Sequence, residues 1–375
     1  MKVVFFSNFM NHHQLPLCMN MQRLTDNNFV FVATETFNPR LVSRGYENLN
    51  NKYPFILASY ESSENNKTAY KIANDSDVLI IGSAPNKYAL KRIKNNKIVF
   101  RYEERPIKDK NPIIKRPIRF IKWSIKYPTN KPVYCLCASA YTYQDYASFG
   151  VLKNKCYKWG YFPEVKKYES INTLIDSKNK NSILWTGRFL DWKHPEAAIA
   201  VSERLKKTGY NFTLNLIGQG ELYEPLKKLI EEKNLTDYVN LLGAMPPEEV
   251  RRHMEESEIF LFTSDRNEGW GAVLNESMNS GCAVVASNAI GSVPYLIENG
   301  KNGLVYQDGN IDELYEKTKY LLDHPLERKA LGAKAYETMV STWNADVAAE
   351  RLLVLAEKLM NGEETPYTEG PCSKA

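Results

Sequence analysis

Two glutamates eight positions apart flank a glycine-containing segment, EGWGAVLNE, from Glu268 to Glu276. A carboxylate can accept hydrogen bonds from two neighbouring sugar hydroxyls, because each of its oxygens can take one O–H group. Glycines at the start of a helix leave backbone N–H groups open to a phosphate. The segment therefore has the groups needed to hold a sugar and a diphosphate. The alternative is a strand–turn–helix corner with two solvated acids.

Two cations follow an apolar run in the segment WTGRFLDWKHPE, where Arg188 and Lys193 lie five residues apart. Arginine offers a planar fork and lysine a point charge, and both suit a diphosphate. Gly218 and Gly220 end another apolar run and precede a helical stretch. Glycine permits close backbone approach to a ligand, although so short a motif also fits a plain turn. For the two cations, the alternative is a pair of solvated loop residues.

The elements that must position these residues alternate between short apolar runs and polar helical stretches along the whole chain. Such alternation predicts parallel β-α-β units, and ligands of these sheets bind at the carboxyl ends of the strands. The predicted strands are 2–7, 29–34, 77–82, 97–102 and 132–137 in a first set, then 182–187, 213–218, 239–243, 259–264 and 282–287 in a second.

Two such sets in 375 residues predict two doubly wound α/β domains. We expect an N-terminal domain over 1–165 and a C-terminal domain over 180–342. An amphipathic helix over 345–360 is expected to pack back onto the first domain, and the polar residues 361–375 are expected to form a flexible tail.

Composition narrows the class of protein. No apolar run approaches the ~18 residues of a membrane span. Cys135 and Cys137 have no second cysteine pair beside them, which favours a buried strand over a zinc site, and six sparse cysteines fit a reducing cytoplasm. Residues 1–170 carry 27 Lys and Arg against 13 Asp and Glu, whereas the remainder carries 22 against 31. The basic half is therefore expected to face an anionic surface or ligand.

Taken together, the motifs resemble those of a known enzyme family. The pattern G-R-x4-K, the strand followed by G-x-G, the pattern E-G-x-G-x4-E and the segment AIGSVPYLIENGKNGLVY over 289–306 occur in the order and spacing of retaining glycosyltransferases of family 4. These enzymes belong to glycosyl transferases group 1 and include members that assemble bacterial polysaccharides. The resemblance runs from about 182 to 325. It implies the GT-B fold, in which two Rossmann-like domains face each other across a cleft, and a reaction without cofactor or metal.

The resemblance also implies roles for single residues. Arg188 and Lys193 would hold the donor diphosphate and stabilise the leaving nucleotide, and Glu268 would contact the donor sugar. Glu276 would accept the ribose hydroxyls, and Met245 would meet the base through its backbone. The remaining donor-side residues are Gly218 and Gly220 after their strand, with Gly269, Trp270, Gly271, Ala272 and Val273, whose amides would wrap the phosphates and sugar.

The N-terminal half departs from the family pattern. Many relatives have a Gly-Gly loop after the first strand, whereas this chain has His12 and His13 there. Glu104 and Arg105 follow a later strand, where relatives often carry a histidine or aspartate near the acceptor. We expect these four side chains on the acceptor side. The alternatives are helix capping or exposure for the histidines, and a surface ion pair for Glu104.

A basic amphipathic stretch lies over 113–127, IIKRPIRFIKWSIKY, inside a region (87–131) with 15 Lys and Arg against three acids. Isoleucines repeat at helical spacing, and Lys115, Arg119, Lys122 and Lys126 form the adjoining face, with Trp123 and Tyr127 as interfacial aromatics. This pattern is typical of a helix lying in the plane of an anionic membrane. The alternative is a helix whose apolar face covers the protein's own core. No nucleic-acid module accompanies it, so nucleic acid is not an expected partner.

The sequence therefore predicts a cytoplasmic glycosyltransferase, peripheral on the inner face of the plasma membrane. It would move a sugar from a nucleotide-diphosphate donor, a UDP-sugar before a GDP-sugar, to a hydroxyl of a glycan acceptor carried on a lipid. Two alternatives remain open: a nucleotide-sugar epimerase or hydrolase with the same fold, and a non-catalytic membrane-associated protein that binds nucleotide sugars.

Overall fold

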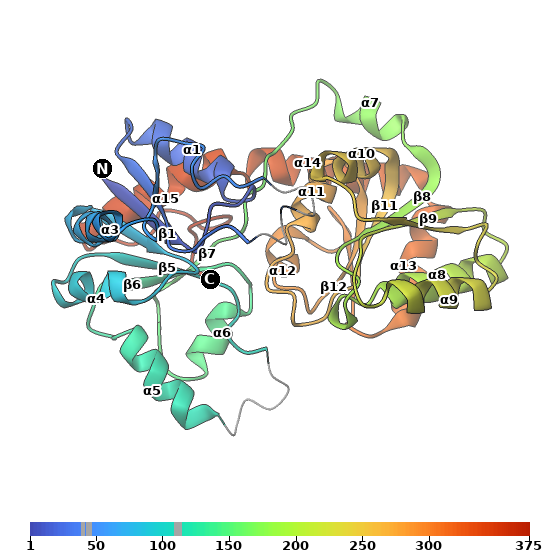
Figure 1. The fold of residues 1–375 in the computed structure, drawn as a ribbon. Coiled ribbons are helices and arrows are strands. Elements are labelled where there is room, and N and C mark those ends of the chain that lie inside the picture. The colour runs from blue at the N-terminus through green and yellow to red at the C-terminus, as the bar shows by residue number, and fades with distance from the viewer. Residues whose placement is uncertain (39–41, 43–46, 109–114) are drawn as a thin grey trace. The chain divides into compact units, whose positions relative to one another are not determined.

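A computed structural model describes residues 1–38, 42, 47–108 and 115–375 (Figure 1). The described residues form two compact units. Unit 1 contains those up to Glu164 and those from Thr342 onward, and unit 2 contains Val165 to Ser341. The segment 166–179, which the sequence left between its two domains, lies in unit 2. No helix in the described part of the chain is long and apolar enough to cross a membrane.

Unit 1 is built on a parallel seven-stranded sheet in the order β3-β2-β1-β4-β5-β6-β7. Its inner strands are buried along almost their whole length, as expected for a parallel sheet covered on both faces. The strands are β1 (Val3–Ser7), β2 (Phe29–Ala33), β3 (Ile56–Ala58), β4 (Val78–Ile81), β5 (Val99–Glu103), β6 (Val133–Cys137) and β7 (Cys156–Lys158). The helices are α1 (Leu15–Leu24), α3 (Ser63–Asp75), α4 (Lys87–Lys94), α5 (Arg116–Lys126), α6 (Thr142–Ala147) and α15 (Ala345–Met360).

The C-terminal helix α15 belongs to unit 1 and packs against α1 (Figure 1). Its first turn is capped by Asn344, whose side chain accepts a hydrogen bond from the backbone N–H of Val347. A capping side chain satisfies one of the N–H groups that a helix start leaves unpaired. The apolar stripe of α15, which includes Leu352 and Leu355, is buried.

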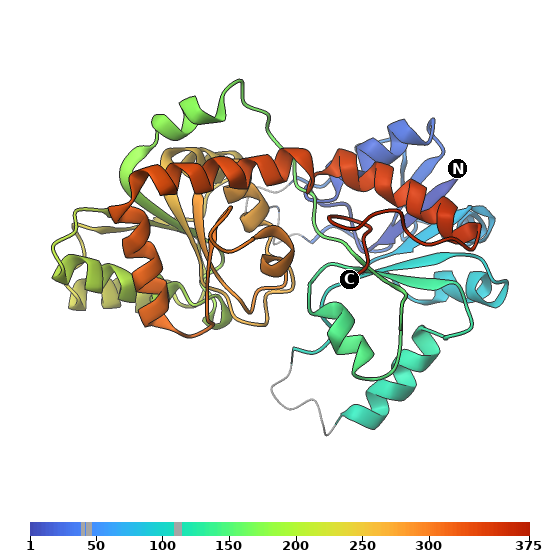
Figure 2. The same cartoon turned by 180° about the vertical axis from the view of Figure 1, so that it is seen from behind.

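The residues after α15 do not form the flexible tail that their polarity suggested. This segment runs back over unit 1 (Figure 2) and its end hydrogen-bonds along β7. Cys372 N–H donates to the carbonyl of Lys158, Lys158 N–H donates to the carbonyl of Ser373, and both distances are 2.8 Å. Cys372 and Ser373 are fully buried. The tail therefore covers the outer edge of a strand that would otherwise expose its backbone groups.

Unit 2 contains a parallel six-stranded sheet in the order β10-β9-β8-β11-β12-β13. The strands are β8 (Asn179–Thr186), β9 (Thr213–Ile217), β10 (Val239–Gly243), β11 (Ser257–Phe262), β12 (Ala283–Ser287) and β13 (Leu304–Tyr306). The helical segments are α7 (Ile171–Asp176), the 3-10 turn η1 (Asp191–Lys193), α8 (Pro195–Lys207), α9 (Tyr223–Glu232), α10 (Pro247–Glu256), α11 (Val273–Asn279), α12 (Val293–Leu296), α13 (Ile311–Asp323) and α14 (Pro325–Ser341).

Both units therefore have the Rossmann-like architecture of a GT-B protein, and the predicted fold class is confirmed. That the two domains face each other across a cleft stays a prediction. In unit 2 the chain leaves β8 toward β9 on one side of the sheet and later returns to β11 on the other side. The carboxyl ends of β8 and β11 are thus the point where the connections diverge. In open α/β sheets, ligands bind at this switch point.

Candidate functional site

Lys193 and Glu268 form an ion pair between the segments that follow β8 and β11. Lys193 is the last residue of η1, and Glu268 lies in the loop that leads to α11. The exposed fractions of the two side chains are only 12% and 11%. The hydroxyl of Ser264 also donates to Glu268 Oε2, at 3.1 Å. Two residues for which the resemblance implies donor contacts are therefore brought together at the switch point.

A buried threonine fixes the backbone that carries Lys193. The hydroxyl of Thr263, directly after β11, lies 2.8 Å from the carbonyl oxygen of Lys193 and 2.9 Å from that of His194. The same oxygen accepts a hydrogen bond from Trp185 Nε1 at 2.8 Å. Both side chains are almost fully buried. Because one hydroxyl joins the ends of β8, β11 and η1, it sets the position of Lys193. Both residues were predicted only as parts of strands.

Arg188 differs from Lys193 in its surroundings. It follows Gly187 directly after β8 and is exposed, and its guanidinium has no ion-pair or side-chain hydrogen-bond partner in the described part of the chain. Its position at a strand's carboxyl end leaves the charge available to an anionic ligand.

His194 connects the turn η1 to α8 with left-handed backbone angles, φ 50° and ψ 52°. Its Nδ1 lies 2.8 Å from Glu196 Oε1, and its Nε2 lies 3.8 Å from Asp265 Oδ2. The hydrogen bond with Glu196 and the charges of the nearby acids raise the pKa of His194. Non-glycine residues rarely adopt these backbone angles. The sequence alone gives no sign of them at His194, apart from its position next to Lys193.

Close packing against the backbone explains why Gly218 and Gly220 are glycines, which the sequence did not reveal. A Cβ atom at Gly218 would lie 1.8 Å from the carbonyl oxygen of Gly187, and one at Gly220 would lie 2.3 Å from that of Phe189. The loop after β9 therefore lies against the loop after β8, which carries Arg188. These glycines shape the site, and a direct contact with a ligand stays a prediction.

The loop between Glu268 and α11 is anchored by Trp270. This side chain is fully buried, its Nε1 donates to Asn275 Oδ1 at 2.9 Å, and its carbonyl accepts from the hydroxyl of Ser292 at 2.6 Å. Gly271 has φ +82°, and a Cβ there would lie 2.3 Å from Phe262 Cζ. The side chain of Trp270 is thus a core anchor, so its predicted donor contact is limited to its backbone N–H.

The other predicted donor-side residues lie in the connection from Glu268 into α11 and in the loop after β10. Gly269, Ala272 and Val273 complete the connection into α11, whose first turn contains Glu276. Met245 is half-buried in the loop after β10. The loop after β9 is tied to the end of β10 by the hydrogen bond from Gly218 N–H to the carbonyl of Gly243, at 2.8 Å. Met245 thus follows β10, and Glu276 lies in the helix that follows β11.

Unit 2 matches the model of a known protein family. Residues 168–338 match the family model described as glycosyl transferases group 1. These residues form a group 1 glycosyltransferase domain. The domain contains the Lys193–Glu268 ion pair, the Thr263 hydroxyl that fixes the backbone of Lys193, and every predicted donor-side residue.

Two of the curated relatives that the chain resembles illustrate the match. The chain is 30% identical over 182 residues to the amylovoran biosynthesis glycosyltransferase AmsK of Erwinia amylovora, covering 47% of this chain and 44% of that protein. It is 30% identical over 209 residues to a trehalose synthase of Pyrococcus horikoshii, covering 52% and 49%. The chain thus spans about half the length of the curated relatives it matches.

A solved structure resembles the chain over nearly its whole length. The Anabaena HepE protein, crystallised in complex with UDP, superposes with a TM-score of 0.70 over 96% of this chain and 100% of that one, at 14% sequence identity. At this identity the likeness shows the fold alone. Unit 1 therefore shares its architecture with such proteins, although the family match is confined to the group 1 domain.

The histidines predicted on the acceptor side lie in unit 1, after β1. The rings of His12 and His13 are 3.6 Å apart between centroids, and the ring of His13 stacks near that of Tyr161 at 6.3 Å. The hydroxyl of Tyr161 donates to Glu104 Oε1 at 2.6 Å. Three of the four predicted acceptor-side residues are thus linked through Tyr161, a residue that no sequence motif indicated.

Arg105 is engaged elsewhere in unit 1. Its guanidinium pairs with Asp145 at 3.3 Å and lies 4.8 Å from the centre of the Tyr141 ring. Asp145 also accepts from the backbone N–H of Ile107 at 3.1 Å. This ion pair holds α6 against the segment after β5, so the structure gives Arg105 an anchoring position.

Helix α5 exposes the apolar face that the alternative interpretation would have buried. Ile118, Ile121 and Ile125 are 72%, 60% and 70% exposed, and Phe120 is also exposed. The interpretation that this face covers the protein's own core is therefore wrong for the described residues. Residues 113 and 114, which begin the predicted segment, lie outside them.

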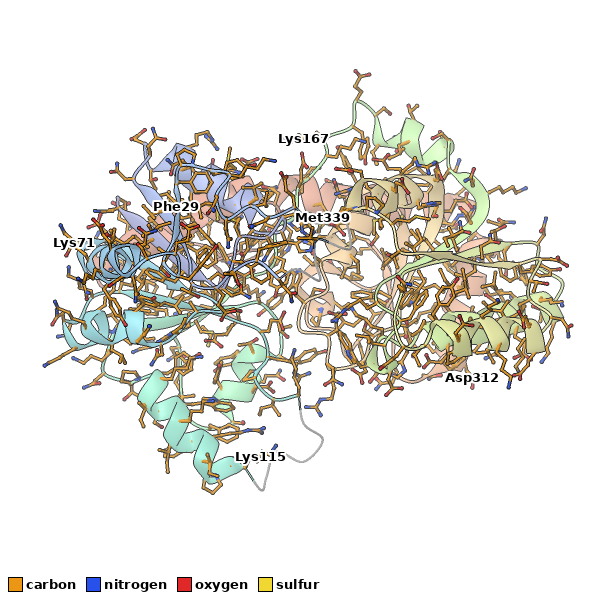
Figure 3. All side chains as sticks on the ribbon, in the orientation of Figure 1. Phe29, Lys71, Lys115, Lys167, Asp312 and Met339 are labelled. Atoms are coloured by element: carbon orange, nitrogen blue, oxygen red, sulfur yellow. The ribbon has the colours of Figure 1, made fainter. Side chains whose placement is uncertain are left out.

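The interpretation of Trp123 and Tyr127 as interfacial aromatics is also wrong. Trp123 is buried and its ring lies 4.6 Å from that of Phe149 and 5.0 Å from that of Tyr146, while Tyr127 is 1% exposed. These two aromatic residues are four positions apart, so they share one helix face, and that face packs against Tyr146 of α6 and Phe149. Among the basic residues, Lys126 pairs with Glu103, whereas Lys122 is exposed and Lys115 lies at the exposed start of α5 (Figure 3).

Proposed function

We propose that the protein is a glycosyltransferase that moves a sugar from a nucleotide-diphosphate donor to a hydroxyl of a glycan acceptor. The observation that carries the proposal is the Lys193–Glu268 ion pair at the switch point of a group 1 domain. One cation and one hydrogen-bond acceptor lie side by side, as the junction between a phosphate and a sugar requires.

In the proposed reaction, the donor diphosphate draws Lys193 away from Glu268 and also meets the exposed Arg188. The carboxylate, once released, accepts the hydroxyls of the donor sugar. The bond between the anomeric carbon and the phosphate oxygen breaks as the acceptor oxygen bonds to the same carbon on the same face, so the anomeric configuration is retained. The acceptor proton passes to the leaving phosphate. Fixed cations stabilise the charge that develops there, and the proposal requires no metal ion.

A UDP-sugar is the favoured donor, with a GDP-sugar as the second candidate. The fold-level likeness to HepE, whose structure contains UDP, supports this preference. We propose that the ribose hydroxyls meet Glu276 and that the base meets the backbone of Met245. Met245 lies in the loop after β10, and Glu276 lies in the first turn of α11.

We further propose a lipid-linked acceptor at an anionic membrane, for a cytoplasmic enzyme that is peripheral on the inner face of the plasma membrane. The exposed isoleucines of α5 lie beside Lys115, Arg119 and Lys122, and such a surface fits the boundary between lipid headgroups and acyl chains. The name of AmsK, an amylovoran biosynthesis enzyme, supports a role in surface polysaccharide assembly.

Incubation of the purified protein with a panel of UDP- and GDP-sugars, with and without a lipid extract that contains the acceptor, tests the proposal. We expect release of the nucleoside diphosphate and of a glycosylated lipid only when both substrates are present. Rapid formation of an epimer or of free sugar without acceptor would favour the epimerase or hydrolase. Binding of the donor without turnover in any acceptor extract would favour the non-catalytic binding protein.

A further inference from the structure

Three cysteines of unit 1 form a cluster that the proposed glycosyl transfer does not use. Cys135 and Cys137 belong to β6 and Cys156 to β7, and one ligand atom from each lies within 4.8 Å of the others. Cys135 and Cys156 are direct partners in the parallel register, and Cys137 is two residues along the same strand face. The sequence shows Cys135 and Cys137 as neighbours, but it does not show that Cys156 joins them, because β7 is only three residues long and was not predicted.

A buried cation lies beside the cluster. Arg101 of β5 is the register partner of Cys135, so their side chains share one face of the sheet. The exposed fraction of Arg101 is 1%, and its Nε has no hydrogen-bond partner in the described part of the chain. The nearby carboxylate of Glu103 is already engaged by Lys126 and by the hydroxyl of Tyr146. A buried guanidinium is costly unless negative charge lies near it, and thiolates would supply that charge.

We propose that Cys135, Cys137 and Cys156 bind a soft monovalent cation, with Cu(I) as the matching ion, through three thiolates. Thiolates select soft ions such as Cu(I). A structural zinc ion almost always takes four ligands, and the described residues contribute only these three to the cluster. Each thiol releases its proton to solvent on binding, and the copper stays in the +1 state, so no electron is transferred.

Access to the cluster depends on the C-terminal tail. The strand β7 is three residues long and lies at the edge of the sheet, where the tail covers it through the bridge between Tyr157 and Lys374. The backbone N–H of Ala375 donates to the carbonyl of Cys156 at 3.1 Å. Local opening of this terminal contact exposes the edge strand without unfolding the inner sheet, which gives the ion a route to the thiols.

Anaerobic loading of the full chain with Cu(I), followed by challenge with a Cu(I) chelator, tests the proposal. We expect the wild type to retain one copper per chain and Cys135→Ala and Cys156→Ala to lose it. The matched controls are Cys18→Ala and Cys282→Ala, which remove buried thiols outside the cluster. Complete loss of copper from the wild type, or equal retention by all four variants, would overturn the proposal in favour of thiols that only fill the core.

An X-ray absorption spectrum of the copper-loaded wild type needs no substitution and so does not depend on whether a variant folds. The spectrum is expected to show three sulfur neighbours around the metal. Two sulfur neighbours, or a shell of nitrogen and oxygen, would contradict the three-thiolate site.

Discussion

Lys193 and Glu268 neutralise each other at the carboxyl ends of β8 and β11, where they stand nearly buried. The pair explains how a cation and an anion can be kept ready in one site without ligand. A diphosphate that binds Lys193 must replace Glu268, and the replaced carboxylate is then free for sugar hydroxyls.

The first prediction concerns Glu268→Gln, which keeps the shape of the side chain and removes its charge. Transfer is expected to fall by about 100-fold or more, the scale of losing one preorganised polar contact in a transition state. Binding of the free nucleoside diphosphate is expected to stay equal or become tighter, because Lys193 no longer has a charged competitor. Transfer rates and calorimetric titration measure the two effects. Weaker diphosphate binding together with unchanged transfer would contradict the proposed exchange.

The second prediction concerns the hydroxyl of Thr263. Thr263→Val keeps the shape but leaves Trp185 Nε1 without its acceptor, and we expect a loss of about 1–3 kcal/mol in unfolding free energy. Because the carbonyl of Lys193 is also released, kcat should fall more than KM rises. Thr263→Ser retains the hydroxyl and should recover kcat. A purely structural threonine would affect stability in both variants while leaving kcat of the folded fraction unchanged.

The third prediction is a pH dependence of stability around His194. The hydrogen bond with Glu196 raises the pKa of His194 in the folded state, so protonation favours folding. The stabilisation is complete below the unfolded pKa of about 6.5 and is lost as the pH rises through the higher folded value. Thermal unfolding of wild type and Glu196→Gln should therefore differ most at acidic pH and converge at alkaline pH. A gap that widens with pH would show the opposite sign.

The fourth prediction concerns the exposed face of α5. Ile121→Glu places a charge on that face and should abolish binding to anionic vesicles, while Lys122→Glu should weaken it, since each basic residue near the surface contributes about 1 kcal/mol. Sedimentation with anionic and with neutral vesicles measures both. The control is Leu326→Glu, at a residue of unit 2 that is 78% exposed, which should bind like the wild type. Equal loss in the control would assign the effect to charge alone.

Much of the fold follows from the sequence because most long strands are continuous apolar runs. The three-residue strands β3, β7 and β13 were missed, since so short a run carries little pattern. In α5, periodicity revealed the isoleucine stripe but could not decide whether that stripe faces the core or is exposed. The structure shows that Trp123 and Tyr127 face inward while the isoleucines face outward.

The candidate site was predictable to the extent that its residues lie in local motifs. Lys193 and Glu268 were found in this way, whereas Thr263 and Tyr161 act through partners distant in sequence, which no local pattern reveals. The tail was misjudged for a similar reason. Its polarity indicated mobility, and only the edge of β7 shows why it is ordered.

Glycosyl transfer by wild type, Lys193→Ala and Lys207→Ala, measured side by side with the same donor and acceptor, tests the central claim most directly. Lys207 is an exposed lysine of the same domain that also pairs with a glutamate, Glu203, and so serves as the matched control. The account predicts that Lys193→Ala loses transfer by about 100-fold or more while Lys207→Ala keeps it. Full transfer by a folded Lys193→Ala variant would contradict the proposed donor site.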